Sequence, residues 1–236
     1  MNGHAQLREM ECDVKARLCD DFAFTLHAMA QPLTVLRGAL GALSLRGASA
    51  SDANRYVELS NAQVERLCSL MSGMNMLLAD FQTEATCTPT NLGELIAAAA
   101  ETGDGDARRS AARISIAEVD HRIQILADRP RAEDAIRAVL AAVGGVSTPD
   151  DEIYLAVDLR DGFADVTVHA MRADEKKLTS VDRLRLMVAE ASVRSQQGIF
   201  ELCSEPLRIS LKFALHDQED PGHEHHDNFS VVGRAR

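Results

Sequence analysis

The first 81 residues repeat apolar side chains at alternating spacings of three and four, which constrains the fold more than any other feature. Such a repeat places the apolar residues along one face of a helix. A basic residue and a C-cap glycine, Arg46 and Gly47, follow the first row and indicate a turn. The pattern predicts two long helices that form a hairpin. The rows are Leu26, Met29, Leu33, Leu36, Leu40 and Leu43, then Gln63, Leu67, Leu70, Met74, Leu77 and Phe81.

The apolar surface of this hairpin is wider than one antiparallel partner helix covers. Val64, Met71 and Leu78 stand beside the second row and broaden its apolar face. A second copy of the hairpin would complete a four-helix bundle, so we expect a homodimer. The alternative is that the C-terminal part of the chain covers the extra face.

After residue 85 the pattern changes to alternating helices and strands. A loop is expected over 83–90, and the remaining elements predict one mixed sheet with helices on one face. The fold class is therefore α+β, with a helical hairpin over 1–85, an α/β sandwich over 86–215 and a flexible polar tail over 216–236. Helices are predicted at 91–100, 131–143 and 181–193, and strands at 112–119, 122–128, 152–159, 164–171, 198–204 and 207–215.

Composition excludes several classes of function. The net charge of −11 argues against general binding to nucleic acid or anionic membranes. Five scattered cysteines without a CxxC pair favour reduced thiols over a disulfide framework or a zinc site. The histidines of the tail sequence GHEHHD are assigned no metal. No apolar run approaches the roughly 20 residues of a membrane span, so a cytoplasmic location is expected.

Pro32 stands in the interior of the first predicted helix, where proline costs about 3 kcal/mol. It follows His27 by five residues, and Gln31 lies on the same helix face as His27. The proline leaves the Ala28 carbonyl without its helical donor, so we expect a bend one turn from the histidine. His27 is expected to project outward, where a ring nitrogen is able to accept a phosphoryl group.

The residues His27, Gln31, Pro32, Leu33 and Thr34 form the pattern HxxxQPLT. This pattern resembles the phosphoacceptor box of sensor histidine kinases with a HisKA-type hairpin. The order of the later elements resembles the ATP-binding domain of those kinases. The resemblance implies that His27 is the phosphoacceptor and that Gln31 positions a water molecule for dephosphorylation of a regulator.

Four departures from the kinase pattern fall on residues that handle nucleotide. The acidic residue that follows the histidine in the family is Ala28 here, and a methyl group neither accepts a proton nor orients a ring. RLRL replaces the glycine-rich GLGL turn at 183–186. Ala138 and Ala142 align with the two asparagines of the family's magnesium-binding helix, and Ala170, Arg172 and Asp174 align with the adenine-reading DxGxG motif. The sites for ATP and magnesium are therefore predicted to be lost, and no cofactor is expected.

The chain thus resembles dimeric histidine phosphotransferases that have lost ATP binding. This resemblance implies that His27 exchanges phosphoryl groups with aspartates of response-regulator receiver domains, which carry their own magnesium site. Phe24, Arg37 and Arg66 are the candidate contacts for a receiver. Two alternatives stay open: a non-catalytic dimeric scaffold that sequesters a regulator or kinase, and a divergent ATP-dependent kinase or regulator phosphatase.

Overall fold

The computed structural model describes residues 3–44, 50–107, 112–173 and 175–216. The turn at Arg46 and Gly47, Asp174, and the predicted tail beyond His216 lie outside these ranges. Within them, no helix combines the length and the apolar character that crossing a membrane requires.

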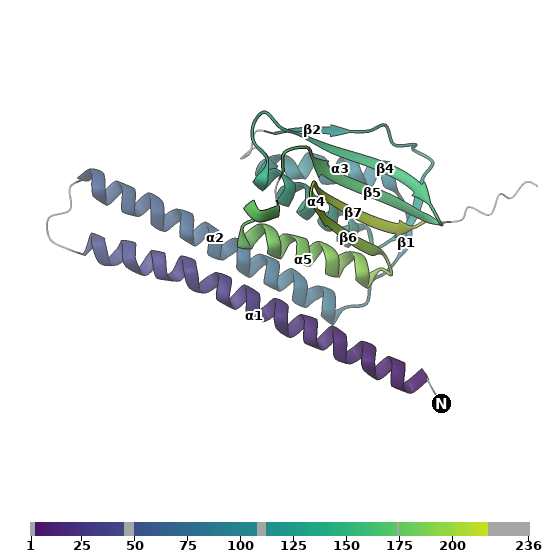
Figure 1. Cartoon of the computed structure of the whole chain (residues 1–236), viewed down its shortest axis with the longest axis horizontal. Coiled ribbons are helices and arrows are strands. Elements are labelled where there is room, and N and C mark those ends of the chain that lie inside the picture. The colour runs from purple at the N-terminus through teal and green to yellow at the C-terminus, as the bar shows by residue number, and fades with distance from the viewer. Residues whose placement is uncertain (1–2, 45–49, 108–111, 174, 217–236) are drawn as a thin grey trace, which may run out of the picture.

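Two long antiparallel helices form the predicted hairpin (Figure 1). α1 spans Gly3–Leu43 and continues through Pro32 without interruption, and α2 spans Ala50–Gln82. The ring of Pro32 is buried, and Thr34 Oγ1 donates to the Ala30 carbonyl at 2.8 Å in the same turn. The predicted bend at Pro32 stays a prediction.

The hairpin buries only part of the predicted α1 row, whereas the described residues of the predicted α2 row are all buried or half-buried. On α1 the buried apolar residues include two alanines, Ala28 and Ala39, each 4% exposed, and Met29 packs beside Ala28 against α2 and α5. Three of the six residues in the predicted α1 row, which were expected to point inward, are exposed: Leu26, Leu33 and Leu40. On α2, Leu70 and Leu77 are buried, whereas Val57, Val64 and Met71 are exposed.

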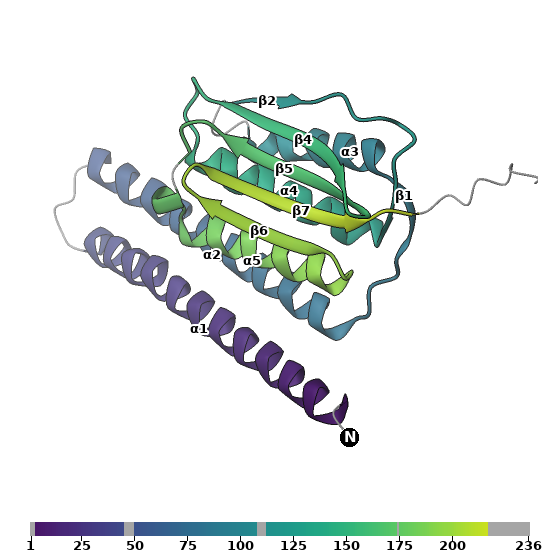
Figure 2. The ribbon, with the colours of Figure 1, turned by 45° about the vertical axis from the view of Figure 1, so that its right-hand side comes forward.

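The remainder of the chain is an α/β sandwich, as predicted, with the helices on one face of a mixed sheet (Figure 2). The five-stranded sheet has the order β2-β4-β5-β7-β6, in which β2 is parallel to β4 and the other pairs are antiparallel. The elements are β1 Thr88–Asn91, α3 Leu92–Ala107, β2 Arg113–Ile116, β3 Gln124–Ala127, α4 Arg129–Val146, β4 Glu152–Arg160, β5 Phe163–Ala170, the 3-10 turn η1 Glu175–Lys177, α5 Ser180–Ser195, β6 Ile199–Ser204 and β7 Leu207–Ala214.

One strand assignment differs from the expectation of a single sheet. The strand predicted at 122–128, β3, pairs with β1 in a separate two-stranded sheet. The first three residues of β1 lie in the stretch predicted as a loop and Asn91 was predicted to begin a helix, because TPTN carries a proline and too few apolar residues for a strand pattern. Thr90 is the buried residue of β1, and it pairs with Ile125.

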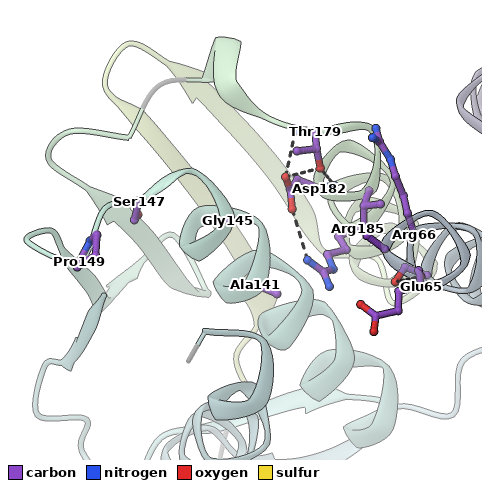
Figure 3. Close-up of a pocket in the computed structure, with 12 residues that line it drawn as sticks. Glu65, Arg66, Ala141, Gly145, Ser147, Pro149, Thr179, Asp182 and Arg185 are labelled. Atoms are coloured by element: carbon purple, nitrogen blue, oxygen red, sulfur yellow. Dashed lines mark hydrogen bonds and ion pairs between the residues drawn. The ribbon is translucent and has the colours of Figure 1, made fainter. Parts of the chain in front are cut away.

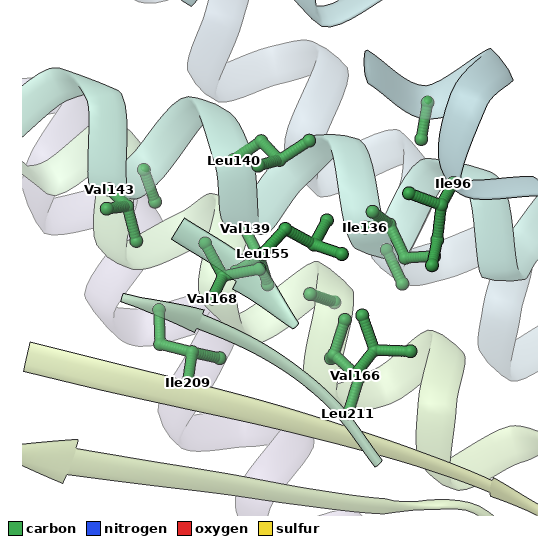
Figure 4. Close-up of a cluster of buried hydrophobic side chains, with 14 of the residues drawn as sticks. Ile96, Ile136, Val139, Leu140, Val143, Leu155, Val166, Val168, Ile209 and Leu211 are labelled. Atoms are coloured by element: carbon green, nitrogen blue, oxygen red, sulfur yellow. The ribbon is translucent and has the colours of Figure 1, made fainter. Parts of the chain in front are cut away.

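The main core lies between the sheet and the helices α3, α4 and α5 (Figure 4). Alternate residues of β5 and β7, among them Val166, Val168 and Leu211, face Val139 of α4. Helix starts are fixed by side-chain caps: Asp128 accepts from the amide of Arg131 at the start of α4, and Thr179 and Asp182 form a reciprocal capping box at α5.

Candidate functional site

His27 lies on the exposed side of α1, as predicted. Gln31, one turn further along the helix, is also exposed and shares its face. Phe24, one turn before the histidine, is half-buried. The helix therefore presents an imidazole and an amide to solvent together, and an approaching molecule is able to contact both.

Ala28, the residue after His27, lies about 100° around the helix from it and is buried in a second apolar cluster. Its partners are Leu70 and Leu77 of α2 and Leu184 and Val188 of α5. A carboxylate at this position would leave water for an apolar environment, which is costly without a compensating partner. The local packing therefore suits the alanine and does not suit the acidic residue of the kinase pattern.

α5 lies along α2 and joins the α/β part to the hairpin. The two helices run parallel. Arg66 Nη2 donates to Ser180 Oγ at 3.2 Å, and Leu184 packs near Gly73 further along both helices. A Cβ added at Gly73 would lie 2.6 Å from Leu184 Cδ2. The glycine therefore permits the close approach of the two helices.

A polar cluster closes the far end of the same interface. Ser192 donates from Oγ to Asp80 Oδ2, and Arg131 Nε lies 3.5 Å from Asp80 Oδ1. Arg131 also donates to the Thr83 carbonyl at 2.8 Å and to Ser195 Oγ at 3.0 Å, so α2, α4 and α5 meet at one guanidinium. Burial raises the pKa of Asp80, while the hydrogen bond from Ser192 and the charge of Arg131 oppose that rise.

A cavity of about 530 Å³ lies between α2, the end of α4 and the start of α5 (Figure 3). Its walls carry two guanidinium groups, Arg66 and Arg185, and two carboxylates, Glu65 and Asp182. Asp182 accepts from the Thr179 amide and hydroxyl at 3.0 and 2.6 Å, and Arg185 Nη1 lies 3.4 Å from its Oδ1. The carboxylate of Asp182 is therefore already held by its own helix.

The positions aligned with nucleotide-binding residues lie in apolar or remote places. Ala142 and Ala170 are fully buried in the main core, and Ala138 packs against it. Arg172 is exposed and lies 3.9 Å from Asp151. Among the described residues, no group of three or more His, Cys, Asp or Glu side chains is placed to hold a metal ion.

The three predicted receiver contacts lie in different local settings. Arg37 is exposed on α1, and Phe24 lines a groove between α1, α5 and β6. Arg66 is turned toward Ser180 and lines the cavity described above, and its Nε is buried without a hydrogen-bond partner. Their roles in partner binding stay predictions.

Sequence reasoning missed the residues that join the two parts of the chain. Leu184 was considered only as part of the RLRL turn, yet it is the side chain that contacts Gly73. Asp80, Arg131 and Ser192 carry no motif, because they are separated by about fifty to sixty residues each and meet only in the folded chain. The one sequence signal was Gly73 itself, an isolated glycine within a strongly periodic helix.

No protein-family model matches the sequence, and no curated protein sequence matches it. Several solved structures share the fold. The histidine kinase AdeS of Acinetobacter baumannii has a TM-score of 0.60 at 14% identity, over 81% of this chain and 98% of its own. The histidine kinase ThkA, solved in complex with the response regulator protein TrrA, has a TM-score of 0.67 at 15% identity, over 93% of this chain and 68% of its own.

Full-length ShkA, solved in complex with AMPPNP, matches 84% of this chain with 46% of its own length, at a TM-score of 0.54 and 13% identity. The ThkA match is long enough to include both the helical hairpin and the α/β sandwich. The chain therefore has the fold of a histidine kinase.

Proposed function

We propose that this chain is a histidine phosphotransferase of two-component signalling that uses His27 and does not use ATP. The observation that carries the proposal is the exposed imidazole of His27 on the hairpin of a histidine-kinase fold. The partner would be a receiver domain that carries an aspartyl phosphate, in keeping with the ThkA structure, which contains a response regulator.

The proposed step needs only one group from this chain. A ring nitrogen of neutral His27 attacks phosphorus, a P–N bond forms, and the acyl P–O bond breaks to release the receiver aspartate as a carboxylate. The receiver supplies its own magnesium ion, which neutralises charge on the transferred group. Transfer onward to a second receiver reverses the same bonds.

The loss of ATP binding is supported by the donor groups near α4 and α5. Magnesium takes carboxylate, carbonyl or water oxygens in octahedral geometry, and the methyl groups of Ala138 and Ala142 offer none. The cavity at the end of α4 carries two guanidinium groups, Arg66 and Arg185, and two carboxylates, so its walls hold no excess of positive charge for a polyphosphate. A Cβ at Gly145 would lie 2.9 Å from Asp182 Oδ1, so α4 and α5 already touch at the cavity wall.

A homodimer is part of the proposal and rests on the two exposed apolar rows. Leu26, Leu33 and Leu40 recur every seven residues on α1 at 51–60% exposure. Val57, Val64 and Met71 recur in the same way on α2. The same repeat on both helices is typical of a four-helix bundle, and a second hairpin would bury both rows.

The test uses purified full-length chain and a panel of receiver domains labelled on aspartate with radioactive phosphate. Transfer should place an acid-labile, base-stable label on the wild-type chain and none on His27→Ala. His121→Ala, which alters another exposed histidine, should transfer like wild type. Labelling of the wild-type chain directly from magnesium ATP would contradict the proposal that the chain does not use ATP. Equal labelling of wild type and His27→Ala would contradict the assignment of His27 as the phosphoacceptor.

Phosphatase action is a second candidate, because Gln31 is exposed on the same face as His27. An amide in this place is able to orient a water molecule toward a receiver phosphate. Gln31→Ala should then slow the release of inorganic phosphate from a receiver while leaving transfer to His27 unchanged. Equal release rates in the two chains would remove this candidate.

A further inference from the structure

A groove of about 500 Å³ lies between α1, α5 and β6, beside the helix face that carries His27. Its floor is apolar and includes Phe24 of α1 and Phe200 and Leu202 of β6. Its lining also holds four carboxylates, those of Asp20, Asp21, Glu175 and Glu190, and one guanidinium, Arg183, so acidic groups are in excess. The groove therefore suits an occupant with apolar side chains next to positive charge.

The upper border of the groove is an edge strand. β6 pairs with β7 and is the last strand in the sheet order, so in the part of the chain that the structure describes its other edge has no strand partner (Figure 2). Ile199 and Leu202 on this strand are 41% and 42% exposed. Natural proteins cover or charge such edges, because an exposed apolar edge pairs with other strands.

The sequence of this chain contains a segment with matching chemistry. Residues 228–236 read NFSVVGRAR, with Phe229 and two valines, then Arg234 and Arg236, and no acidic residue. Phenylalanine and valine favour strands. In an extended segment Phe229 and Val231 point to one side and Ser230 to the other.

The segment is close enough to reach the groove. Leu211 of β7 is paired with Phe200 of β6, and the described chain ends at His216, five residues beyond Leu211. That end is held by β3, because the His216 amide donates to the Gln124 carbonyl at 2.9 Å, and it lies at most about 17 Å along the sheet and one strand spacing, about 5 Å, across from Phe200. The twelve residues 217–228 span up to about 40 Å when extended, which exceeds this distance.

We propose that residues 228–236 bind along the free edge of β6 in the same chain, with Phe229 and Val231 in the groove and the two arginines beside its carboxylates. Backbone pairing with an edge strand is a common mode of peptide recognition. The bound segment covers the exposed side chain of Leu202, which lines the groove. It also borders the approach to His27, but the proposal does not depend on phosphoryl transfer.

The first experiment is a cross-link in the full-length chain. Cys203 is an exposed free cysteine on β6, and its side chain alternates with Leu202, away from the groove. Ser230→Cys would place a second thiol on that same side of the added strand. A short bismaleimide reagent should link residues 203 and 230, with much less linkage to the other exposed cysteines, Cys68 and Cys87.

A matched control keeps Ser230→Cys and adds Phe229→Ser, Val231→Ser, Arg234→Glu and Arg236→Glu. The 203–230 linkage should fall to the level of the linkages with Cys68 and Cys87 in this chain. Equal linkage in both chains would overturn the proposal. Linkage between an isotope-labelled and an unlabelled chain, rather than within one chain, would also overturn it.

Amide hydrogen exchange gives a second readout without introduced cysteines. The amides of residues 199–204 should exchange about tenfold more slowly in the wild-type chain than in the fourfold tail variant, because strand pairing must open before exchange. β5, in the interior of the sheet, should exchange alike in both chains. Equal exchange of β6 in the two chains would contradict the proposal.

Discussion

Gly73 shows how one missing side chain positions two parts of this molecule. Leu184 Cγ would lie 2.8 Å from a Cβ at this position, and Leu184 itself is 1% exposed. Gly38 of α1 offers a contrast, because a Cβ there would meet nothing within 4 Å. Both glycines lie inside helices, so they share the backbone cost of about 1 kcal/mol relative to alanine.

The substitutions Gly73→Ala and Gly38→Ala should therefore change the free energy of unfolding by different amounts or in opposite directions. Gly38→Ala should raise the free energy of unfolding by about 0.5 to 1 kcal/mol through helix propensity alone. Gly73→Ala should lose that gain and destabilise the chain by about 1 kcal/mol, because Leu184 must move within a packed cluster. Denaturant unfolding measures both, and equal stabilisation by the two changes would show that α5 moves freely on α2.

The ionisation of Asp80, at the interface between α2 and α5, makes the stability of the chain depend on pH. The pKa of its carboxyl is raised in the folded chain above the ordinary value of 3.8, mainly by burial. At pH values between 3.8 and the folded pKa, the carboxyl of Asp80 holds its proton more tightly in the folded chain than in the unfolded chain. The free energy of unfolding therefore decreases as the pH rises through this range. Asp80→Asn removes this dependence.

The free energy of unfolding of Asp80→Asn, minus that of wild type, should therefore increase as the pH rises from 3.8 through the folded pKa of Asp80. Urea unfolding of both chains across this range measures the difference. A difference that falls with rising pH would mean that the ion pair with Arg131 outweighs the burial of the carboxylate.

Single residues were predictable where the helix period alone decides their exposure. His27 and Gln31 are exposed, as their spacing predicts. The period did not reveal that Ala28 contacts Leu184 and Val188, because those residues are about 160 positions away. The sequence therefore located the imidazole and left the contacts of its neighbour undetermined.

At the scale of elements, periodicity predicted the two long helices and most of the strands. It failed for β1, where a four-residue strand with a proline buries one side chain. On α1 it also could not divide the apolar row into a face covered within the chain and a face left exposed. Leu33 and Leu36 have the same chemistry in sequence, yet Leu33 is 53% exposed and Leu36 is half-buried.

The exposed rows give a direct test of the dimer. Leu33→Glu with Val64→Glu would place charges in the centre of the proposed four-helix bundle, where burial of a charge is costly. The variant should be monomeric at concentrations where the wild type is dimeric, as measured by sedimentation. Thr34→Glu adds a charge at an exposed position beside the row and should leave the mass unchanged. A monomeric wild type would contradict the dimer.

At the scale of the whole molecule, α5 belongs to two cores. Leu186, Ala189 and Val193 pack into the main core under the sheet, and Leu184 and Val188 pack into the cluster on the hairpin. A helix that is apolar on two faces predicts burial on both sides, but not the identity of the second partner. The sequence offered cover of the hairpin by the C-terminal part of the chain as an alternative, but it did not identify α5 as the helix that docks there.

Because α5 packs into two separate cores, we expect the helical hairpin and the α/β sandwich to separate before either of them unfolds. Val188→Asp would place a carboxylate against Leu70 and Leu77 while leaving the main core intact, and should weaken docking by about 3 kcal/mol or more. X-ray scattering should report a larger radius of gyration, and unfolding should divide into two transitions. Met171→Asp, at a position 78% exposed, should match the wild type. A single transition at unchanged radius would mean that the polar cluster of Asp80, Arg131 and Ser192 holds the parts together without the apolar contact.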